Sequence, residues 1–120
     1  MNEESKKLSE LVKDLRLEVL CGGEHLDRSV TGGYVSDLLS DVMAHTKKGA
    51  LWITLQGHPN IVAVAVLKEL SGIVLINKRQ PDEETLEKAR NEKVAIMTSE
   101  LPAFELVGKL YQMGLSGTAC

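Results

Sequence analysis

The chain contains few aromatic residues and has no long hydrophobic run. Only 3% of its 120 residues are Phe, Trp or Tyr, so a folded core has to be built from aliphatic side chains. No apolar stretch approaches the roughly 20 residues that span a bilayer, and the charged first ten residues do not resemble a secretion signal. We therefore expect a cytoplasmic protein that does not enter a membrane.

Cysteine is also scarce. The two cysteines, Cys21 and Cys120, are far apart in the sequence, which does not indicate a structural disulfide. A buried structural thiol is the default expectation for Cys21, whereas Cys120 at the chain end suits disulfide exchange or no role at all. The sequence leaves open whether either has a redox role.

Excess positive charge and the common catalytic patterns are missing as well. The chain has 14 Lys and Arg against 17 Asp and Glu, without a basic cluster, which argues against a nucleic-acid partner. The phosphate-binding pattern GxxxxGK[ST] is absent. The three histidines stand in unrelated segments without the spacing of a zinc site. We expect no metal, no cofactor and no catalytic residue.

What the chain does contain is a repeated couplet of a short apolar run, a polar turn and a helix-like segment, beginning at Leu51, Ile73 and Val94. This alternation predicts an α/β fold with a mostly parallel sheet flanked by helices. We expect one domain over residues 1–114 and a flexible tail over 115–120. The expected strands are 17–20, 30–35, 51–55, 73–76 and 94–97, and the expected helices are 5–15, 36–45, 61–67, 82–91 and 102–113.

Polar residues follow two of the expected strands. Gln56, His58 and Asn60 come after residues 51–55, and Asn77 and Arg79 come after the next strand. Ligands of open parallel sheets bind outside the carboxyl ends of the strands, so these side chains can line a shallow site for a nucleotide or small anion. A solvated edge without a ligand is an alternative that the sequence leaves open.

Residues 61–67 are seven consecutive apolar residues, which we interpret as the helix that crosses between two parallel strands. A helix that is apolar on nearly all sides is not satisfied by one sheet face alone. The simplest second contact is another copy of the chain across a two-fold axis. We therefore predict a homodimer with Ile61, Val62 and Val66 in its interface.

Three blocks carry a resemblance that covers nearly the whole chain: VTGGYVSDLLSDVMAH, LWITLQGHPNIVAVAVLKEL and LPAFELVGKLYQMG. In this order they resemble the small stand-alone DRTGG-domain proteins. Such domains also occur as inserts in regulated pyrophosphatases and are similar to the N-terminal domain of the HPr serine kinase. In none of these is the domain the catalytic part, and the resemblance implies an accessory α/β domain, typically dimeric. A kinase label would describe only the related domain, because kinase chemistry needs a phosphate-cradling loop with its lysine.

The resemblance also implies a setting, because stand-alone members resemble proteins encoded beside iron-only hydrogenase and NADH-linked redox subunits. The loops depart from the family pattern: Gln56-Gly57-His58 replaces Gly-Asp-Arg, and Ile76-Asn77-Lys78 replaces Thr-Gly-Gly. A family ligand is therefore not assumed.

Our leading hypothesis is a non-catalytic, homodimeric regulatory or scaffold domain of a redox or energy-metabolism system, with a redox-enzyme or kinase-like protein as candidate partner. The alternative is a small-ligand sensor for a nucleotide or anion that binds at the loops after the strands. An enzyme that uses Cys21 or His58 is the weakest reading, because neither has a supporting partner residue in the sequence.

Overall fold

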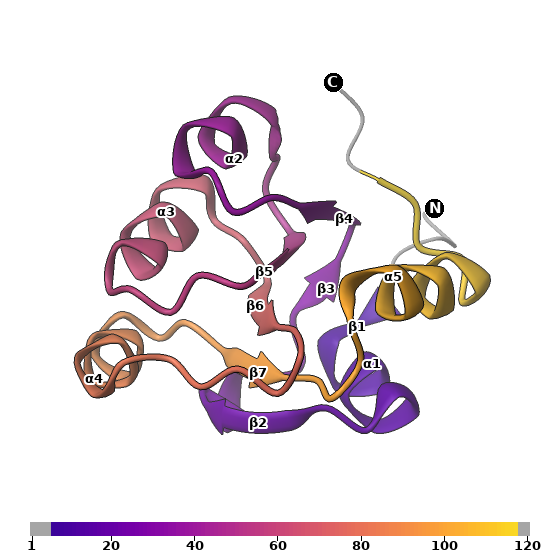
Figure 1. Ribbon diagram of the computed structural model, residues 1–120, viewed down its shortest axis with the longest axis horizontal. Helices are drawn as coiled ribbons and strands as arrows, with labels where there is room; N and C mark the ends of the chain where they lie inside the picture. The colour runs from indigo at the N-terminus through magenta and orange to yellow at the C-terminus, as the bar shows by residue number, and fades with distance from the viewer. Residues whose placement is uncertain (1–5, 118–120) are drawn as a thin grey trace.

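The computed structural model describes residues 6–117, in which helices cover both faces of a five-stranded sheet (Figure 1). The strand order is β2-β7-β6-β5-β4, with β2 antiparallel to β7 and all other neighbours parallel. The strands are β2 Glu18–Cys21, β4 Gly32–Val35, β5 Ala50–Thr54, β6 Gly72–Leu75 and β7 Ile96–Thr98. Two short strands, β1 Lys6–Lys7 and β3 Ser29–Val30, form a separate antiparallel pair.

The helices are divided between the two faces of the sheet (Figure 1). The three on one face link successive parallel strands, and they are α2 Leu39–His45, α3 Asn60–Lys68 and α4 Glu83–Glu92. The two on the other face are α1 Leu8–Leu15 and α5 Ala103–Gln112, and a short 3-10 turn, η1 Gly23–His25, follows β2. None of the helices in residues 6–117 is long and apolar enough to cross a bilayer.

Strand β5 shows how the sequence builds two cores. All five of its residues are buried, and successive side chains of a strand point to opposite faces. Trp52 packs into the cluster beneath α2, α3 and α4, whereas Leu51 and Ile53 pack into the cluster that contains residues of α1 and α5. The predicted α/β class and its mostly parallel sheet are confirmed, and both clusters are largely aliphatic.

Some boundaries differ from the expected ones. Residues 6 and 7 pair with β3, so α1 begins at Leu8, and the Lys7 N–H donates to Glu10 Oε1 at 2.9 Å. The expected cap Ser5 lies outside the described residues. The last parallel strand begins at Ile96 instead of Val94, because Lys93 ends α4 in a left-handed conformation and the Val94 N–H donates to the Ala89 carbonyl.

Residues 115–117 belong to the fold, which corrects the prediction of a loose tail from residue 115. Leu115 is buried, the Gly33 N–H donates to the Ser116 carbonyl at 3.0 Å, and Gly117 forms a bridge with Gly33. The segment therefore continues along β4, the edge strand of the sheet. Cys120, for which the sequence left a redox role open, lies outside the described residues.

Helix α3 has the second contact that its apolar sequence predicted, but its own chain provides it. The helix lies between α2 and α4 and contacts both (Figure 1). Ile61 and Val62 are fully buried in this packing, so they have no surface left for a second chain. Their assignment to a dimer interface is therefore wrong. Val66, which is 43% exposed, stays a predicted contact.

Candidate functional site

The residues predicted to bind a ligand lie beyond the carboxyl ends of the parallel strands, in loops or, for Asn60, at the start of α3. His58, Asn60, Asn77 and Arg79 are exposed, and Gln56 is half-buried. Their polar atoms partly serve the loops themselves, because His58 Nδ1 accepts a hydrogen bond from the Asn60 N–H at 3.1 Å. The fold thus brings the loops to one edge, as expected for neighbouring parallel strands.

These loops are tied together by buried or charged side chains. The Gly57 carbonyl accepts hydrogen bonds from Thr85 Oγ1 at 2.6 Å and from the Asp82 N–H at 3.0 Å. Asp37 Oδ1 accepts from Thr54 Oγ1 and from the Leu55 N–H, both at 2.7 Å. Asp37 therefore joins the loop after β4 to the end of β5, a role that its sequence context does not predict.

The loop after β6 is a tight turn. Asn77 and Lys78 have φ values of 56° and 58°, and the Arg79 N–H donates to the Ile76 carbonyl at 3.0 Å, which is the pattern of a type I′ turn. The Lys78 N–H donates to the Ser99 carbonyl at 2.7 Å, and Lys78 Nζ lies 3.7 Å from Glu100 Oε2. The turn is therefore anchored to the loop after β7.

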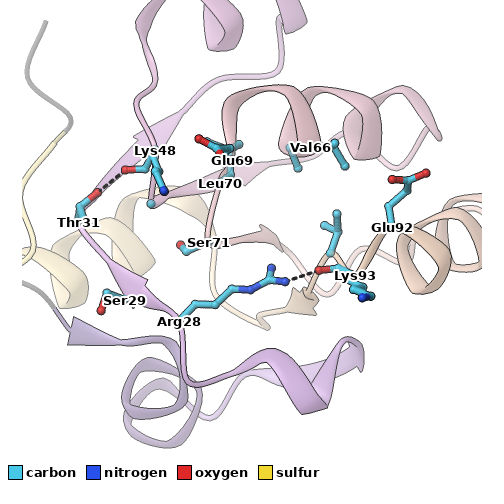
Figure 2. Close-up of a pocket in the computed structure, with 13 residues that line it drawn as sticks. Arg28, Ser29, Thr31, Lys48, Val66, Glu69, Leu70, Ser71, Glu92 and Lys93 are labelled. Atoms are coloured by element: carbon cyan, nitrogen blue, oxygen red, sulfur yellow. Dashed lines mark hydrogen bonds between the residues drawn. The ribbon is translucent and has the colours of Figure 1, made fainter.

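A cavity of about 620 Å³ opens at the opposite edge of the sheet, where the parallel strands begin (Figure 2). We call it the amino-edge cavity. Four stretches of chain form it: the region of β3, the residues before β5, the end of α3 with the start of β6, and the end of α4. Its lining residues are Arg28, Ser29, Thr31, Lys48, Gly49, Ala65, Val66, Glu69, Leu70, Ser71, Glu92, Lys93 and Val94.

The cavity combines an apolar wall with charged side chains. Ala65, Val66, Leu70 and Val94 supply the apolar part. The charged residues are three cations and two acids: Arg28, Lys48 and Lys93 with Glu69 and Glu92. Figure 2 shows the guanidinium of Arg28 reaching across the cavity, where Nη2 donates a hydrogen bond to the Lys93 carbonyl. This bond holds the guanidinium in place.

The backbone around the cavity takes conformations that favour glycine. Gly49 has a φ of 87°, and a Cβ there would lie 2.9 Å from Cγ2 and Oγ1 of Thr31. Glu69 and Lys93, which end α3 and α4, have φ values of 55° and 62°. Left-handed backbone costs a residue with a side chain roughly 1–2 kcal/mol. Two helices thus end in this conformation on residues whose charged side chains line the cavity.

Local sequence patterns do not reveal this cavity. Arg28 can be identified as a surface cation and Lys48 as a favourable residue near a helix end, but each is ordinary in its own segment. The cavity exists only because four distant segments meet. Sequence reasoning pointed to the other edge because it followed the general rule for open parallel sheets.

Cys21 has the environment of a structural residue. Cys21 is buried, as predicted, and its Sγ lies 3.5 Å from the Val94 carbonyl oxygen. Burial raises the pKa of its thiol, which favours the unreactive neutral form. Within residues 6–117, no three His, Cys, Asp or Glu side chains gather as metal ligands would.

The fold is that of a small α/β domain with a parallel sheet core. The model of the DRTGG domain family matches residues 10–113, which is most of the chain. The chain therefore belongs to the DRTGG domain family, and the predicted family is confirmed.

A solved structure shares this fold. It contains the CBS and DRTGG domains of the regulatory region of the Clostridium perfringens pyrophosphatase, complexed with its activator diadenosine tetraphosphate. The TM-score is 0.71 at 16% sequence identity, over 89% of this chain and 46% of that chain. Our chain thus spans about half the length of that structure. A search of curated proteins finds no match.

Proposed function

We propose that this chain is a regulatory domain without catalysis of its own, and that it binds a small anion, about the size of a mononucleotide, in the amino-edge cavity. The observation that carries the proposal is a cavity of about 620 Å³ with an apolar wall and three cationic side chains. Small-molecule sites typically have volumes of about 300–1,000 Å³ and combine apolar walls with a few polar groups.

The charged residues suit a phosphate group. A guanidinium has five N–H donors in a planar arrangement that matches phosphate oxygens, and Arg28 is held across the cavity by the Lys93 carbonyl. Lys48 and Lys93 add two ammonium groups to the lining. Glu69 and Glu92 can accept hydrogen bonds from sugar hydroxyls, and Val66 and Leu70 offer a surface for a base.

The comparison supports a nucleotide as the ligand class. The pyrophosphatase regulatory region that shares this fold was crystallised with diadenosine tetraphosphate. We carry over only the chemistry of phosphate and nucleoside groups, and the place of binding is argued from the cavity itself.

The rest of the sequence hypothesis stays a proposal. It includes self-association as a dimer, a cytoplasmic redox or energy-metabolism setting, and a redox-enzyme or kinase-like partner. The carboxyl edge, with Gln56, His58, Asn60, Asn77 and Arg79, is the alternative position for the ligand site.

The test is isothermal titration with AMP, ATP and diadenosine tetraphosphate. In the variant Arg28→Ala/Lys48→Ala we expect affinity to fall more than tenfold, because hydrogen bonds to charged groups contribute about 1.5–3 kcal/mol each. The matched control is Lys78→Ala/Arg79→Ala, which removes the same charge from exposed positions at the carboxyl edge. We expect it to bind like the unsubstituted protein.

Two outcomes would contradict the proposal. Loss of binding in the control variant alone would move the site to the carboxyl edge. Absence of binding by the unsubstituted protein to all three nucleotides would exclude this ligand class. Circular dichroism of both variants keeps a folding defect from being mistaken for either result.

A further inference from the structure

The charges around the amino-edge cavity nearly cancel, although three of its side chains are cationic. Glu69 and Glu92 supply two negative charges, and each stands where a helix ends (Figure 2). The carboxyl end of a helix carries roughly half a negative charge, because its last carbonyl groups have no partner in the helix. Helices α3 and α4 both end at this cavity, so their two ends and the two acids offset the three cations. The cavity therefore attracts an anion at individual side chains and has no strong overall positive field.

Many hydrogen-bond donors of the cavity lining are already used by the chain itself. Thr31 Oγ1 donates to the Lys48 carbonyl at 3.0 Å, and Ser71 Oγ donates to the Ala50 carbonyl at 3.1 Å. The backbone N–H groups of Thr31, Gly49 and Ser71 also donate to carbonyl groups, at 2.9–3.0 Å. Sites that hold a chain of phosphate groups use free backbone N–H groups, from a glycine-rich loop and the amino end of a helix. This cavity has the carboxyl ends of two helices in that place.

Arg28 is the side chain best placed to hold a phosphate group. Its Nη2 donates to the carbonyl of Lys93, the residue that caps the end of α4, and the guanidinium keeps further N–H groups for a ligand. A guanidinium binds two oxygens of one phosphate group in a planar, bidentate contact. Lys48 lines the cavity from another segment and adds an ammonium group that can bind the same phosphate. These donors suit one phosphate group better than a chain of them.

We infer that the amino-edge cavity selects a ligand with a single phosphate group, a nucleoside monophosphate, over ligands with a chain of phosphates. This inference rests on the proposed function and narrows its ligand class. In a nucleoside monophosphate, one charged group meets Arg28 and Lys48, and the neutral sugar and base meet the acids and the apolar wall. A second or third phosphate brings further negative charge beside Glu69 and Glu92 or stays outside the cavity. Like charges placed side by side strongly disfavour a wrong ligand.

The two acids of the lining keep their charge for this selection. Within residues 6–117, no ion pair links Glu69 or Glu92 to a cationic side chain. An ionised carboxylate only accepts hydrogen bonds, so it can bind the hydroxyl groups of a sugar. The oxygens of an ionised phosphate have no hydrogen to donate to it. The same two side chains therefore favour a sugar and disfavour an additional phosphate at their positions.

Isothermal titration of the full chain with AMP, ADP and ATP, without divalent cations, tests the inference. We expect AMP to bind roughly tenfold tighter than ATP, with ADP between them. The variant Glu69→Gln/Glu92→Gln removes the two negative charges at nearly constant shape, so it should strengthen ATP binding roughly tenfold and change AMP binding much less. The matched control is Glu84→Gln/Glu87→Gln, which removes the same charge from exposed positions elsewhere on α4. It should leave the preference for AMP unchanged.

ATP that binds as tightly as AMP would overturn the inference and leave the proposed function standing. A chain that binds none of the three nucleotides would instead contradict the proposed function. An unchanged preference for AMP in Glu69→Gln/Glu92→Gln would also overturn the inference, because the acids would then not be its cause. Addition of Mg²⁺ gives one more test: if ATP then binds tighter than AMP, the acids hold a metal ion together with the phosphate chain, and the inference is wrong. Circular dichroism of both variants checks that they keep the fold.

Discussion

The two edges of the parallel sheet differ in what their polar side chains do. At the carboxyl edge, side chains connect loops: Thr85 binds the Gly57 carbonyl, and Asp37 binds the end of β5. At the amino edge, backbone bonds join the segments beside the side-chain bonds that Arg28 and Thr31 donate to carbonyl groups. The Gly49 N–H donates to the Glu69 carbonyl at 2.9 Å, and the Thr31 N–H donates to the Gly49 carbonyl at 3.0 Å.

The side chains at the two edges also differ in what they surround. At the carboxyl edge, side-chain oxygen atoms of Asp37 and Thr85 are engaged in hydrogen bonds between the loops. At the amino edge, the side chains of Arg28, Lys48 and Lys93 line a cavity, and the Lys93 carbonyl holds the Arg28 guanidinium there. The cavity at the amino edge thus lies outside the general rule that places ligands at the carboxyl ends of parallel strands.

The largest change in the free energy of unfolding is expected when a glycine at each edge is replaced by alanine. Gly49→Ala places a Cβ 2.9 Å from Thr31 and requires a left-handed alanine, so we expect the free energy of unfolding to fall by roughly 1–3 kcal/mol. Gly57→Ala places a Cβ 3.1 Å from Cα of Pro81 without a positive φ, and we expect a loss of about 1 kcal/mol. Urea unfolding of both variants measures the difference. A neutral Gly49→Ala would mean that the wall of the amino-edge cavity adjusts freely.

The next largest difference in stability is expected between variants of one threonine at each edge, Thr85 and Thr31. Thr85 is fully buried, so Thr85→Val removes its bond to Gly57 at nearly constant volume and should cost about 1 kcal/mol. Thr31 is exposed, and Thr31→Val removes its 3.0 Å bond to the Lys48 carbonyl at a cost below about 0.5 kcal/mol. Thermal unfolding of both variants checks this. Equal losses would contradict the view that the buried bond of Thr85 contributes more to stability than the exposed bond of Thr31.

Two lysines with left-handed backbone allow the effect of a substitution on stability to be distinguished from its effect on nucleotide binding. Lys78 at the carboxyl edge and Lys93 at the amino edge have φ values of 58° and 62°. Lys78→Gly and Lys93→Gly should each stabilise the protein by about 0.5–1 kcal/mol, because glycine adopts this conformation without steric cost.

The same two variants should differ in nucleotide binding. Lys93→Gly removes a cation from the cavity and should weaken binding roughly tenfold, whereas Lys78→Gly should not change it. Titration of both variants under the same conditions makes this comparison. Unchanged binding in Lys93→Gly would remove this lysine from the proposed site, and weaker binding in Lys78→Gly would favour the carboxyl edge.

The fold was predictable from sequence because its signals are local. Apolar runs of strand length alternate with polar turns and helix-like segments, and this pattern gave the parallel core around β5, β6 and β7. The environment of α3 was not predictable in the same way. Residues 61–67 show that the helix needs contacts on several sides, but they do not show that α2 and α4 of the same chain provide them.

The candidate site was not predictable because its parts are remote in sequence and individually ordinary. Arg28 follows a turn, Lys48 follows a helix, and Lys93 ends another helix. Only the strand order places them at one edge, and the strand order depends on packing across the whole domain. Helix α5 shows the opposite case. Its apolar residues are visible in sequence, but sequence alone does not reveal that Phe104 and Tyr111 point away from the core.

The smallest effect on stability is expected for Asp41 in α2. Its hydrogen bonds extend the side-chain hydrogen bonds of the carboxyl edge along this helix. Hydrogen bonds from Ser36, Tyr34 and His45 hold the pKa of the Asp41 carboxyl below its ordinary value of 3.8. Tyr34 Oη lies 2.9 Å from Oδ2, and His45 Nδ1 lies 2.9 Å from Oδ1. The carboxylate is therefore more stable in the folded than in the unfolded chain.

Because the folded pKa is lowered, this contribution to stability is fully present above pH 3.8 and is lost as the pH falls through the folded pKa. Asp41→Asn should thus lower the melting temperature slightly at neutral pH, and the difference from the unsubstituted protein should shrink in acid. Asp14→Asn, which removes an exposed carboxylate of α1, is the matched control and should show no such convergence. A difference for Asp41→Asn that stays constant down to strongly acidic pH would show that the substitution acts through packing instead of charge.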